Sequence, residues 1–381
     1  MAAVPVPLFD PRAQYARLRS RIDERMRAVL EHGRYVLGPE VTELEHALAR
    51  VADADHVVTV GNGTDALTIA LMAEGIGPGD AVFVPSLTFV ATAGAVIAAG
   101  ATPVFCDVDR STFTLDPEDL ARRAAQLRGG LKARAVIPVD LFGQPADYPA
   151  LSDVAQAFGL RIVADAAQSM GGALGGRPVG GLAPVTATSF YPTKPIGALG
   201  DGGALFTGDA ECASRMKAIR AHGDERMDGL NSRLDTLQAA VLLVKLEVME
   251  ADRARRSDIA AHYDAALSDH VGLQVRPAEA LTARAVYAIL SDRRETIRAV
   301  LAERGISSRA YYATPLHLMA SMRTHSDGPG SLPVTEALSE RLLALPLHAD
   351  LSDGDVDRVC EAVLAALHEP PAAARDAAAS R

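Results

Sequence analysis

The sequence predicts an α/β protein with a large, mostly parallel sheet and a smaller C-terminal α+β domain. Short β-rich runs alternate with helical patterns through the first two-thirds of the chain, which is typical of βαβ units. The expected strands are His56–Val60, Ala81–Val84, Thr102–Phe105, Ala135–Val139, Arg161–Ala164, Thr186–Phe190 and Gly203–Thr207. In such sheets, ligands collect outside the carboxyl ends of the strands.

A long helix is expected after these strands. It should begin near Asn231, with Asn231 or Ser232 as N-cap, and run to about Leu267. Its apolar residues step by three and four positions and so share one helical face: Leu234, Leu237, Val241, Val244 and Val248. The pattern indicates a helix that links two domains.

The expected organisation is a large domain over residues 1–235, a linker helix with a small domain over 236–368, and a disordered tail over 369–381. The tail is rich in Ala, Pro and Arg, a composition that buries little apolar surface. The small domain has weaker patterning, with a strand near Val286–Leu290 and helices near Glu295–Arg304, Thr335–Leu343 and Asp353–Leu367.

Composition limits the class of protein. The chain has 381 residues, 49% of them apolar, and a net charge of −10, which argues against nucleic acid as a partner but allows a small anionic substrate. The three cysteines lie far apart, without metal-ligand spacing or a disulfide framework, and the start lacks a signal peptide. We therefore expect a cytoplasmic protein without a metal or a membrane partner.

One uncharged stretch, between Asp80 and Asp107, is long enough to suggest a membrane span. It is rich in Ala, Gly and Thr and is interrupted by Pro85 and Pro103. We interpret it as a strand, a buried helix over about Thr88–Ala99, and a second strand.

Lys194 is the most informative single residue. It follows an expected strand and precedes a glycine-dense turn, while Asp165 ends another strand. A lysine that forms a Schiff base with a cofactor aldehyde, and a carboxylate that keeps the pyridine nitrogen protonated, are what pyridoxal phosphate (PLP) chemistry requires. An isolated lysine in a Gly-rich loop would instead be read as a surface residue, and Asp165 alone as a cap of the turn that follows it.

Other segments at strand ends strengthen the cofactor interpretation. Asn62–Leu67 opens a helix, whose free N–H groups suit a phosphate, although a simple capped turn is the alternative. Phe89 is placed to stack on a flat ring, or else is a core residue. Gln168 is expected near the ring hydroxyl, or bonded to the backbone, and Ser189 at a phosphate oxygen.

Together these segments resemble the DegT/StrS family of sugar aminotransferases, from about Pro7 to His368. The most specific matches are Asn62–Leu67, Thr88–Thr92, Asp165–Ser169, Ser189–Gly203, Asn231–Ala240 and Tyr312–Leu318. The resemblance implies a fold-type-I PLP enzyme that works as a homodimer with active sites at the subunit interface. It also implies that L-glutamate donates an amino group to a nucleotide-linked keto-sugar, in the biosynthesis of amino sugars for polysaccharides, lipopolysaccharides or glycosides.

The resemblance implies a role for each matched residue. Lys194 carries the cofactor and Asp165 holds its nitrogen. The main chain at Gly63, Thr64 and Asp65 and the side chain of Ser189 bind phosphate. Phe89 stacks on the ring, and Gln168 lies near its hydroxyl. Asn231 reaches the phosphate of the neighbouring subunit.

Two departures from the family pattern bear on the substrate. Many members have a histidine where this chain has Asp140, before Leu141-Phe142-Gly143-Gln144, and many have Asn where it has Pro195. Lys194-Pro195-Ile196-Gly197 and Asn231–Gln238 resemble the branch that acts on UDP-linked 2-acetamido-3-keto sugars or their uronic acids.

Three residues are candidates for substrate binding: Arg233, Tyr312 and His317. Arg233 and His317 would supply positive charge for a diphosphate. Arg233 is alternatively a structural partner of Asp235 or another carboxylate, and His317 a cap of the turn after Pro315.

Three other functions are alternatives for a chain of this kind. A sugar dehydratase of this fold has histidine in place of the lysine, so Lys194 argues against it. An aminotransferase for a dTDP-linked keto-deoxysugar or a keto-cyclitol remains open. A non-catalytic regulator would have lost cofactor residues that this chain keeps.

Overall fold

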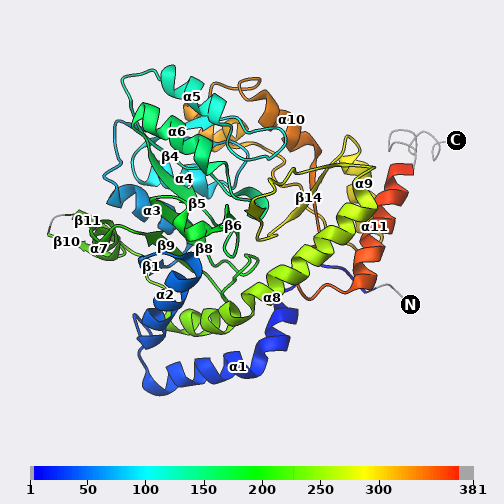
Figure 1. The fold of residues 1–381 in the computed structure, drawn as a ribbon, viewed down its shortest axis with the longest axis horizontal. Coiled ribbons are helices and arrows are strands. Elements are labelled where there is room, and N and C mark those ends of the chain that lie inside the picture. Colours follow the sequence, from blue (N-terminus) through cyan, green and yellow to red (C-terminus); the bar gives the residue numbers. More distant parts are fainter. Residues whose placement is uncertain (1–3, 226, 369–381) are drawn as a thin grey trace.

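The computed structural model describes residues 4–225 and 227–368 (Figure 1). Seven of the described strands form the central sheet, in the order β1-β9-β8-β5-β4-β2-β3. Their bounds are β1 His56–Val60, β2 Asp80–Pro85, β3 Thr102–Cys106, β4 Lys132–Val136, β5 Arg161–Asp165, β8 Val185–Ser189 and β9 Gly203–Thr207. Neighbouring strands are parallel, except that β9 runs antiparallel to β1 and β8. The expected α/β class is confirmed.

Each expected strand of this sheet is present, and the largest difference in position concerns β4. We expected a strand over Ala135–Val139, but β4 covers Lys132–Val136. Pro138 has no N–H to donate, so the ladder cannot continue regularly through it. Val139 instead makes an isolated bridge to Asp165, at the end of β5.

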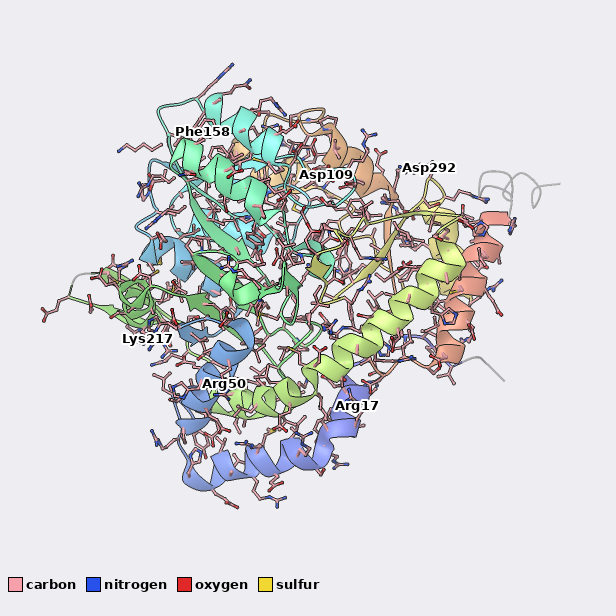
Figure 2. All side chains as sticks on the ribbon, viewed as in Figure 1. Arg17, Arg50, Asp109, Phe158, Lys217 and Asp292 are labelled. Atoms are coloured by element: carbon pink, nitrogen blue, oxygen red, sulfur yellow. The ribbon has the colours of Figure 1, made fainter. Side chains whose placement is uncertain are left out.

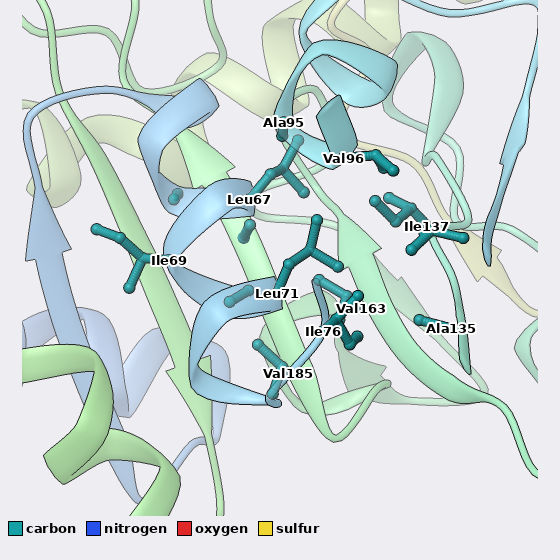
Figure 3. Packing of buried hydrophobic residues seen from close by; sticks show 14 of the residues in the cluster. Leu67, Ile69, Leu71, Ile76, Ala95, Val96, Ala135, Ile137, Val163 and Val185 are labelled. Atoms are coloured by element: carbon teal, nitrogen blue, oxygen red, sulfur yellow. The ribbon is translucent and has the colours of Figure 1, made fainter. Parts of the chain in front are cut away.

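Helices cover both faces of the sheet. They are α2 Pro39–Ala52, α3 Gly63–Ala73, α4 Ala91–Ala98, α5 Pro117–Ala125, α6 Tyr148–Phe158 and α7 Ala210–Ile219. Side chains alternate along each strand: Val82 packs with α3 and α4, whereas the next residue, Phe83, packs with α5 and α6. Figure 3 shows Leu71 of α3 close to Val163 and Val185 of the sheet, whereas Leu67 of the same helix extends toward Ala95 of α4.

The uncharged stretch between Asp80 and Asp107 folds as β2, α4 and β3, as expected. The helix starts at Ala91 rather than Thr88, because residues 86–90 form a turn beyond β2. Across the described residues, no helix is both long and apolar enough to cross a membrane. The same residues contain no group of three or more His, Cys, Asp or Glu side chains that could hold a metal ion.

Helix α8, Thr236–Leu267, crosses the molecule and begins later than expected (Figure 1). Its N-cap position is Asp235, so the proposed caps Asn231 and Ser232 are wrong. Asn231 ends a strand, β11 Met227–Asn231, that pairs with β10 Ala221–Asp224. The side chain of Ser232 accepts a hydrogen bond from Gly61 N instead of capping the helix.

The two ends of α8 belong to different cores. Leu242 near its start packs with Val41 and Phe190 of the large domain, whereas Tyr263 near its end packs with the C-terminal helices. Helix α1, Pro11–His32, lies along α8, and its Arg17 bonds Asp252 of α8 at 2.8 Å (Figure 2). The long helix is therefore a rigid connection between the two parts.

The C-terminal part is built on a second sheet, β12-β14-β15. Its elements are β12 Gly272–Leu273, β14 Tyr287–Leu290, α9 Arg294–Glu303, α10 Pro333–Arg341, β15 Leu342–Leu345 and α11 Asp353–His368. We expected one helix over Thr335–Leu343, but its end is β15, where pairing with β14 buries each leucine and overrides helical periodicity.

Shorter elements complete the described chain: β6 Ala173–Leu174, β7 Arg177–Pro178, β13 Ala280–Leu281, η1 Leu141–Gly143, η2 Val179–Gly181, η3 Leu316–Leu318 and η4 Ala320–His325. Val6, near the start of the chain, packs in the C-terminal core. The division between residues 235 and 236 stays a prediction. The expected tail, 369–381, lies outside the described residues.

Candidate active site

The residues singled out from the sequence follow strands whose carboxyl ends face one edge of the sheet. Strands β1, β2, β4, β5 and β8 all run in one direction. Asn62, Phe89, Asp165 and Lys194 follow or end four of them. This common direction brings segments distant in sequence to one site.

The loop that carries Lys194 is held by its backbone. Lys194 N donates to Tyr191 O at 2.9 Å, and Ala198 N donates to Phe190 O at 2.7 Å. Gln238 of α8 accepts a hydrogen bond from Leu199 N at 2.8 Å. These bonds fix where the lysine leaves the main chain.

Asp165 is the carboxylate that faces Lys194. Only 7% of it is exposed. Its Oδ2 accepts a hydrogen bond from Thr92 Oγ1 at 2.9 Å, and its Oδ1 accepts one from Ala167 N at 3.2 Å. The bond from Ala167 N is the turn cap that the sequence suggested as the alternative role of Asp165. The other carboxylate oxygen accepts the bond from Thr92, so the carboxylate does more than cap the turn.

The two groups influence each other's protonation. Burial lowers the pKa of Lys194, and the negative charge of Asp165 opposes this change. Burial raises the pKa of Asp165, against the hydrogen bonds from Thr92 and Ala167 and the positive charge of Lys194. A lysine with a lowered pKa is more often neutral at neutral pH, which is what a proton-transferring base or a nucleophile needs.

The start of α3 is the candidate anion site. Asn62 is the N-cap, and its Oδ1 accepts a hydrogen bond from Asp65 N at 2.8 Å. The main-chain N–H of Asp65, which we expected to bind phosphate, thus already donates its hydrogen bond to Asn62. The helix start still offers the amides of Gly63 and Thr64, which have no intrahelical acceptor.

Gly63 and Ser189 lie in direct contact at this anion site. A Cβ added to Gly63 would lie 2.6 Å from Ser189 Cβ, closer than real side chains approach. Only glycine therefore allows the helix start and the end of β8 to meet here. The contact brings together two segments that the sequence assigns to phosphate.

Gln168 and Tyr312 are joined. Gln168 Oε1 accepts a hydrogen bond from Phe142 N at 2.8 Å, and Gln168 Nε2 donates to Tyr312 Oη at 3.3 Å. The amide of Gln168 is thus bonded to the backbone of another segment rather than to that of its own turn. This bond links Tyr312, a substrate candidate, to the turn that follows Asp165, because Gln168 lies in that turn.

Phe89, Asn231 and Arg233 lie at the periphery of the described site. Phe89 is 55% exposed in the turn after β2, with its ring accessible rather than in the core. Arg233 Nη2 donates to Asn231 Oδ1 at 2.6 Å, so its partner is this amide and not Asp235. Both side chains remain accessible enough to meet another molecule.

His317 does not lie where the sequence suggested. It is only 2% exposed. Its Nδ1 lies 2.7 Å from Ser86 Oγ, and its Nε2 lies 3.1 Å from Glu336 Oε1. His317 therefore joins η3 to the end of β2 and to α10, and its imidazole is not free to face a diphosphate. It is also not a simple cap of the turn after Pro315.

Two contributors to the site were missed. Thr92 received no role of its own, yet it bonds Asp165, and Thr88 Oγ1 lies 3.1 Å from Thr92 Oγ1. Asp140 was noted only as a departure, yet it is fully buried beside the Asp165 segment. The spacing of Thr88 and Thr92, four residues apart past a strand end, was an available signal. Nothing local indicated the partners of Asp140.

An easily deprotonated amine opposite a buried carboxylate, with a helix start open to an anion, fits pyridoxal phosphate. The amine would hold the cofactor aldehyde, the carboxylate its ring nitrogen, and the helix start its phosphate. The class of protein that this fold and site define is the PLP-dependent transferase of the α/β type.

Comparison with known proteins agrees. The model of the DegT/DnrJ/EryC1/StrS aminotransferase family matches residues 16–364. The UDP-2-acetamido-2-deoxy-3-oxo-D-glucuronate aminotransferase of Pseudomonas aeruginosa is 40% identical over 364 residues, 94% of this chain and 99% of that one. The dTDP-3-amino-3,4,6-trideoxy-alpha-D-glucose transaminase of Streptomyces venezuelae is 40% identical over 365 residues, 94% of this chain and 95% of that one.

A solved structure is equally similar. The DegT DnrJ EryC1 StrS aminotransferase from Brucella abortus superposes with a TM-score of 0.92 at 44% identity, over 95% of this chain and 99% of that one. The chain belongs to the DegT/DnrJ/EryC1/StrS aminotransferase family, a family of PLP-dependent enzymes.

The contact between Gly63 and Ser189 yields a prediction. Gly63→Ala should destabilise the protein by about 1–3 kcal/mol, the usual cost of overpacking, and should weaken PLP binding because the helix start is pushed away from Ser189. Gly354→Ala is the matched control, since its Cβ would meet nothing within 4 Å. Denaturant unfolding and a PLP titration measure both effects. Equal PLP affinity in the two variants would contradict the assignment of this site.

Proposed function

We propose that this aminotransferase moves the amino group of L-glutamate to a nucleotide-linked keto-sugar. The best candidate is a UDP-linked 2-acetamido sugar, or its uronic acid, with a ketone at C3. The observation that carries the chemistry is the pairing of Lys194 with Asp165 at neighbouring strand ends. The substrate is supported by the name of the Pseudomonas aeruginosa relative, an aminotransferase for UDP-2-acetamido-2-deoxy-3-oxo-D-glucuronate.

Lys194 and Asp165 divide the proton chemistry between them. Bound PLP supplies an aldehyde that takes the amino group and a ring that takes up electrons. Lys194 Nζ would move a proton from the donor's α-carbon to the carbon of the bound cofactor that takes the amino group, and in the second half-reaction it would move a proton in the opposite sense, to the acceptor carbon. Burial lowers the pKa of this amine, which favours the neutral form that such a base needs. The Asp165 carboxylate holds positive charge on the ring nitrogen, and Thr92 keeps that carboxylate oriented.

The remaining residues hold the cofactor in place. The amides of Gly63 and Thr64 and the hydroxyl of Ser189 take the phosphate, and Asp65 stabilises the turn through Asn62. The exposed ring of Phe89 stacks on one face of the cofactor. Gln168, oriented by Phe142 and Tyr312, lies near the ring hydroxyl.

We further propose that the enzyme is a homodimer with shared active sites. Apolar side chains on segments that flank the site are half-exposed: Tyr35, Val36, Phe89 and Tyr191. Val36 bridges to Asp235, close to Asn231 and Arg233. A second copy that covers these side chains would bring the partner's Asn231 and Arg233 to the site.

Arg233 is suited to bind the diphosphate of a substrate that lies in the active site of the neighbouring subunit. It is partly exposed and forms no ion pair with the described residues, its one hydrogen bond being to Asn231. A guanidinium without a carboxylate partner keeps its charge and donors for a phosphate. Tyr312, whose hydroxyl accepts a hydrogen bond from Gln168, is the second candidate for sugar binding.

A dTDP-linked keto-deoxysugar is the second candidate substrate. The Streptomyces venezuelae relative, a transaminase named for a dTDP-linked deoxysugar, is 40% identical to this chain, as is the Pseudomonas aeruginosa relative. Overall similarity therefore does not separate the two nucleotides. The sequence motifs at Lys194–Gly197 and Asn231–Gln238 favour the UDP-linked sugar.

The role of Asp165 predicts the effect of Asp165→Asn. This variant should still bind PLP but should transaminate glutamate about 10²-fold or more slowly, because a neutral amide cannot hold charge on the ring nitrogen. The measurement is a single-turnover absorbance trace with glutamate. Asp153→Asn, at an exposed position on α6, is the control and should react at the normal rate. A normal rate in Asp165→Asn would show that Asp165 is misassigned.

Shared sites predict complementation between inactive subunits. Lys194→Ala and Asn231→Ala homodimers should each be weak, whereas exchange between them should create heterodimers with about one intact site each. Activity is measured before and after subunit exchange, with exchange confirmed by differently tagged subunits. If confirmed heterodimers gain nothing, each subunit uses its own Asn231.

The substrate assay decides the proposed function. The enzyme is incubated with a 3-amino UDP-sugar and 2-oxoglutarate, in the reverse direction because the keto-sugars are unstable, and glutamate is measured. We expect turnover, no turnover in Lys194→Ala, and a raised KM for the nucleotide sugar alone in Arg233→Gln. A clear preference for a dTDP-linked 4-keto sugar or a cyclitol would overturn the substrate assignment.

A further inference from the structure

Asp140 is a buried carboxylate with an unusually complete set of donors. It lies beyond β4 and is fully buried. Its Oδ1 accepts hydrogen bonds from Ala146 N and Tyr148 Oη, both at 2.9 Å, and its Oδ2 accepts one from Ser169 Oγ at 2.6 Å. A buried carboxylate is tolerated only when such bonds replace water.

These contacts tie Asp140 to both ends of one turn. At the first end of this turn, Asp140 N donates to Asp165 O at 3.0 Å. At the other end, Ser169 Oγ donates to the Asp140 carboxylate. The turn between them carries Asp165 and Gln168, both proposed to hold the cofactor. Gln168 is also bonded to Phe142, two residues after Asp140.

The charge of Asp140 is coupled to that of Asp165. Burial raises the pKa of Asp140 to about 7, against the hydrogen bonds from Ser169, Ala146 and Tyr148, and the negative charge of Asp165 raises it further. The ionisable groups that act on it are Tyr148 from α6 and Asp165 from β5, and Lys194 acts on Asp165 in turn. Asp140 is therefore the second buried carboxyl behind the proposed cofactor site.

We propose that Asp140 is a positioning residue that clamps the Asp165–Ser169 turn at both ends, so that Asp165 and Gln168 are held in the orientation that binds PLP. The inference rests on the proposed cofactor roles of Asp165 and Gln168. A carboxylate suits this position because it accepts from three donors at once, whereas an amide oxygen has fewer acceptor sites and brings an N–H₂ group that needs acceptors.

The alternative is that Asp140 only stabilises the fold. Either role lets Asp140→Asn change the stability of the fold, so stability alone does not separate them. A positioning role also predicts weaker PLP binding at a pH and temperature where the variant is fully folded. The decisive quantity is therefore the PLP dissociation constant of the folded apoenzyme, measured by fluorescence or absorbance titration.

The experiment compares Asp140→Asn, Ser169→Ala and Tyr148→Phe with the unmodified enzyme at pH 8. We expect the PLP dissociation constant to rise about tenfold or more in Asp140→Asn and severalfold in Ser169→Ala, which opens one end of the clamp. Tyr148→Phe leaves the clamp intact and should bind PLP normally. Normal binding in both folded Asp140→Asn and Ser169→Ala would overturn the proposal. If Asp140→Asn does not fold, Ser169→Ala against Tyr148→Phe decides in the same way.

The pH dependence of the apoenzyme is a second readout. An unfolded aspartate titrates near pH 4 and folded Asp140 at about 7, so its contribution to stability is present at low pH and is lost as pH rises through about 7. Asp140→Asn should lack this loss, which falls between about pH 4 and 7, and Tyr148→Phe should extend the loss to higher pH because a pKa-lowering bond is removed. Identical profiles in all the proteins would contradict the coupling.

The outcome also separates this inference from the proposed function. If the unmodified enzyme binds no PLP at all, the proposed function fails, because the control itself is negative. If the unmodified enzyme binds PLP and only the comparison among variants fails, the clamp is wrong and the cofactor assignment stands.

Discussion

The attraction between Lys194 and Asp165 is the interaction on which the site depends. Asp165 is buried and Lys194 is partly buried, and burial acts against the charged form of each. The charge of each partner acts in the opposite direction and favours the charged form of the other. An amine poised in this way can form a covalent bond to a carbonyl and can also carry a proton, which is what an aminotransferase asks of a single residue.

Contacts outside the site hold Lys194 and Asp165 in their relative positions. Strand β8, which leads to Lys194, is paired with β5, which ends on Asp165, so the two residues leave adjacent strands of one rigid sheet. Thr92 orients the carboxylate from α4, and Gln238 supports the lysine loop from α8. Because α8 also reaches the C-terminal core, the active-site loop is braced by both parts of the chain.

The central sheet and the helix start at Asn62 could be predicted because their signals are local. Strand periodicity and N-cap chemistry depend on a few neighbouring residues. Asn231 shows the limit: it is a good N-cap residue, but pairing in the β10–β11 hairpin places the helix start at Asp235. Leu342 and Leu343 likewise fit the helical pattern of Thr335–Leu343, but they belong to β15 and pair with β14.

The contacts of single polar side chains were the least predictable part. His317 matched the family pattern, yet Ser86 and Glu336, distant in sequence, take both of its ring nitrogens. The importance of Asp140 likewise arises from Tyr148 and Ser169, which only the folded chain brings to it. A sequence shows which groups can bond, whereas their burial and partners are properties of the tertiary structure.

A second buried lysine makes the central claim sharply testable. Lys245 of α8 is 2% exposed, its Nζ has no hydrogen-bond partner among the described residues, and burial lowers its pKa to about 8. Low pKa alone would thus allow either lysine to bind the cofactor aldehyde. The position opposite Asp165 selects Lys194. Borohydride reduction of the PLP-loaded enzyme followed by peptide mapping should place the pyridoxyl group on Lys194, and a label on Lys245 or on another residue would contradict the account.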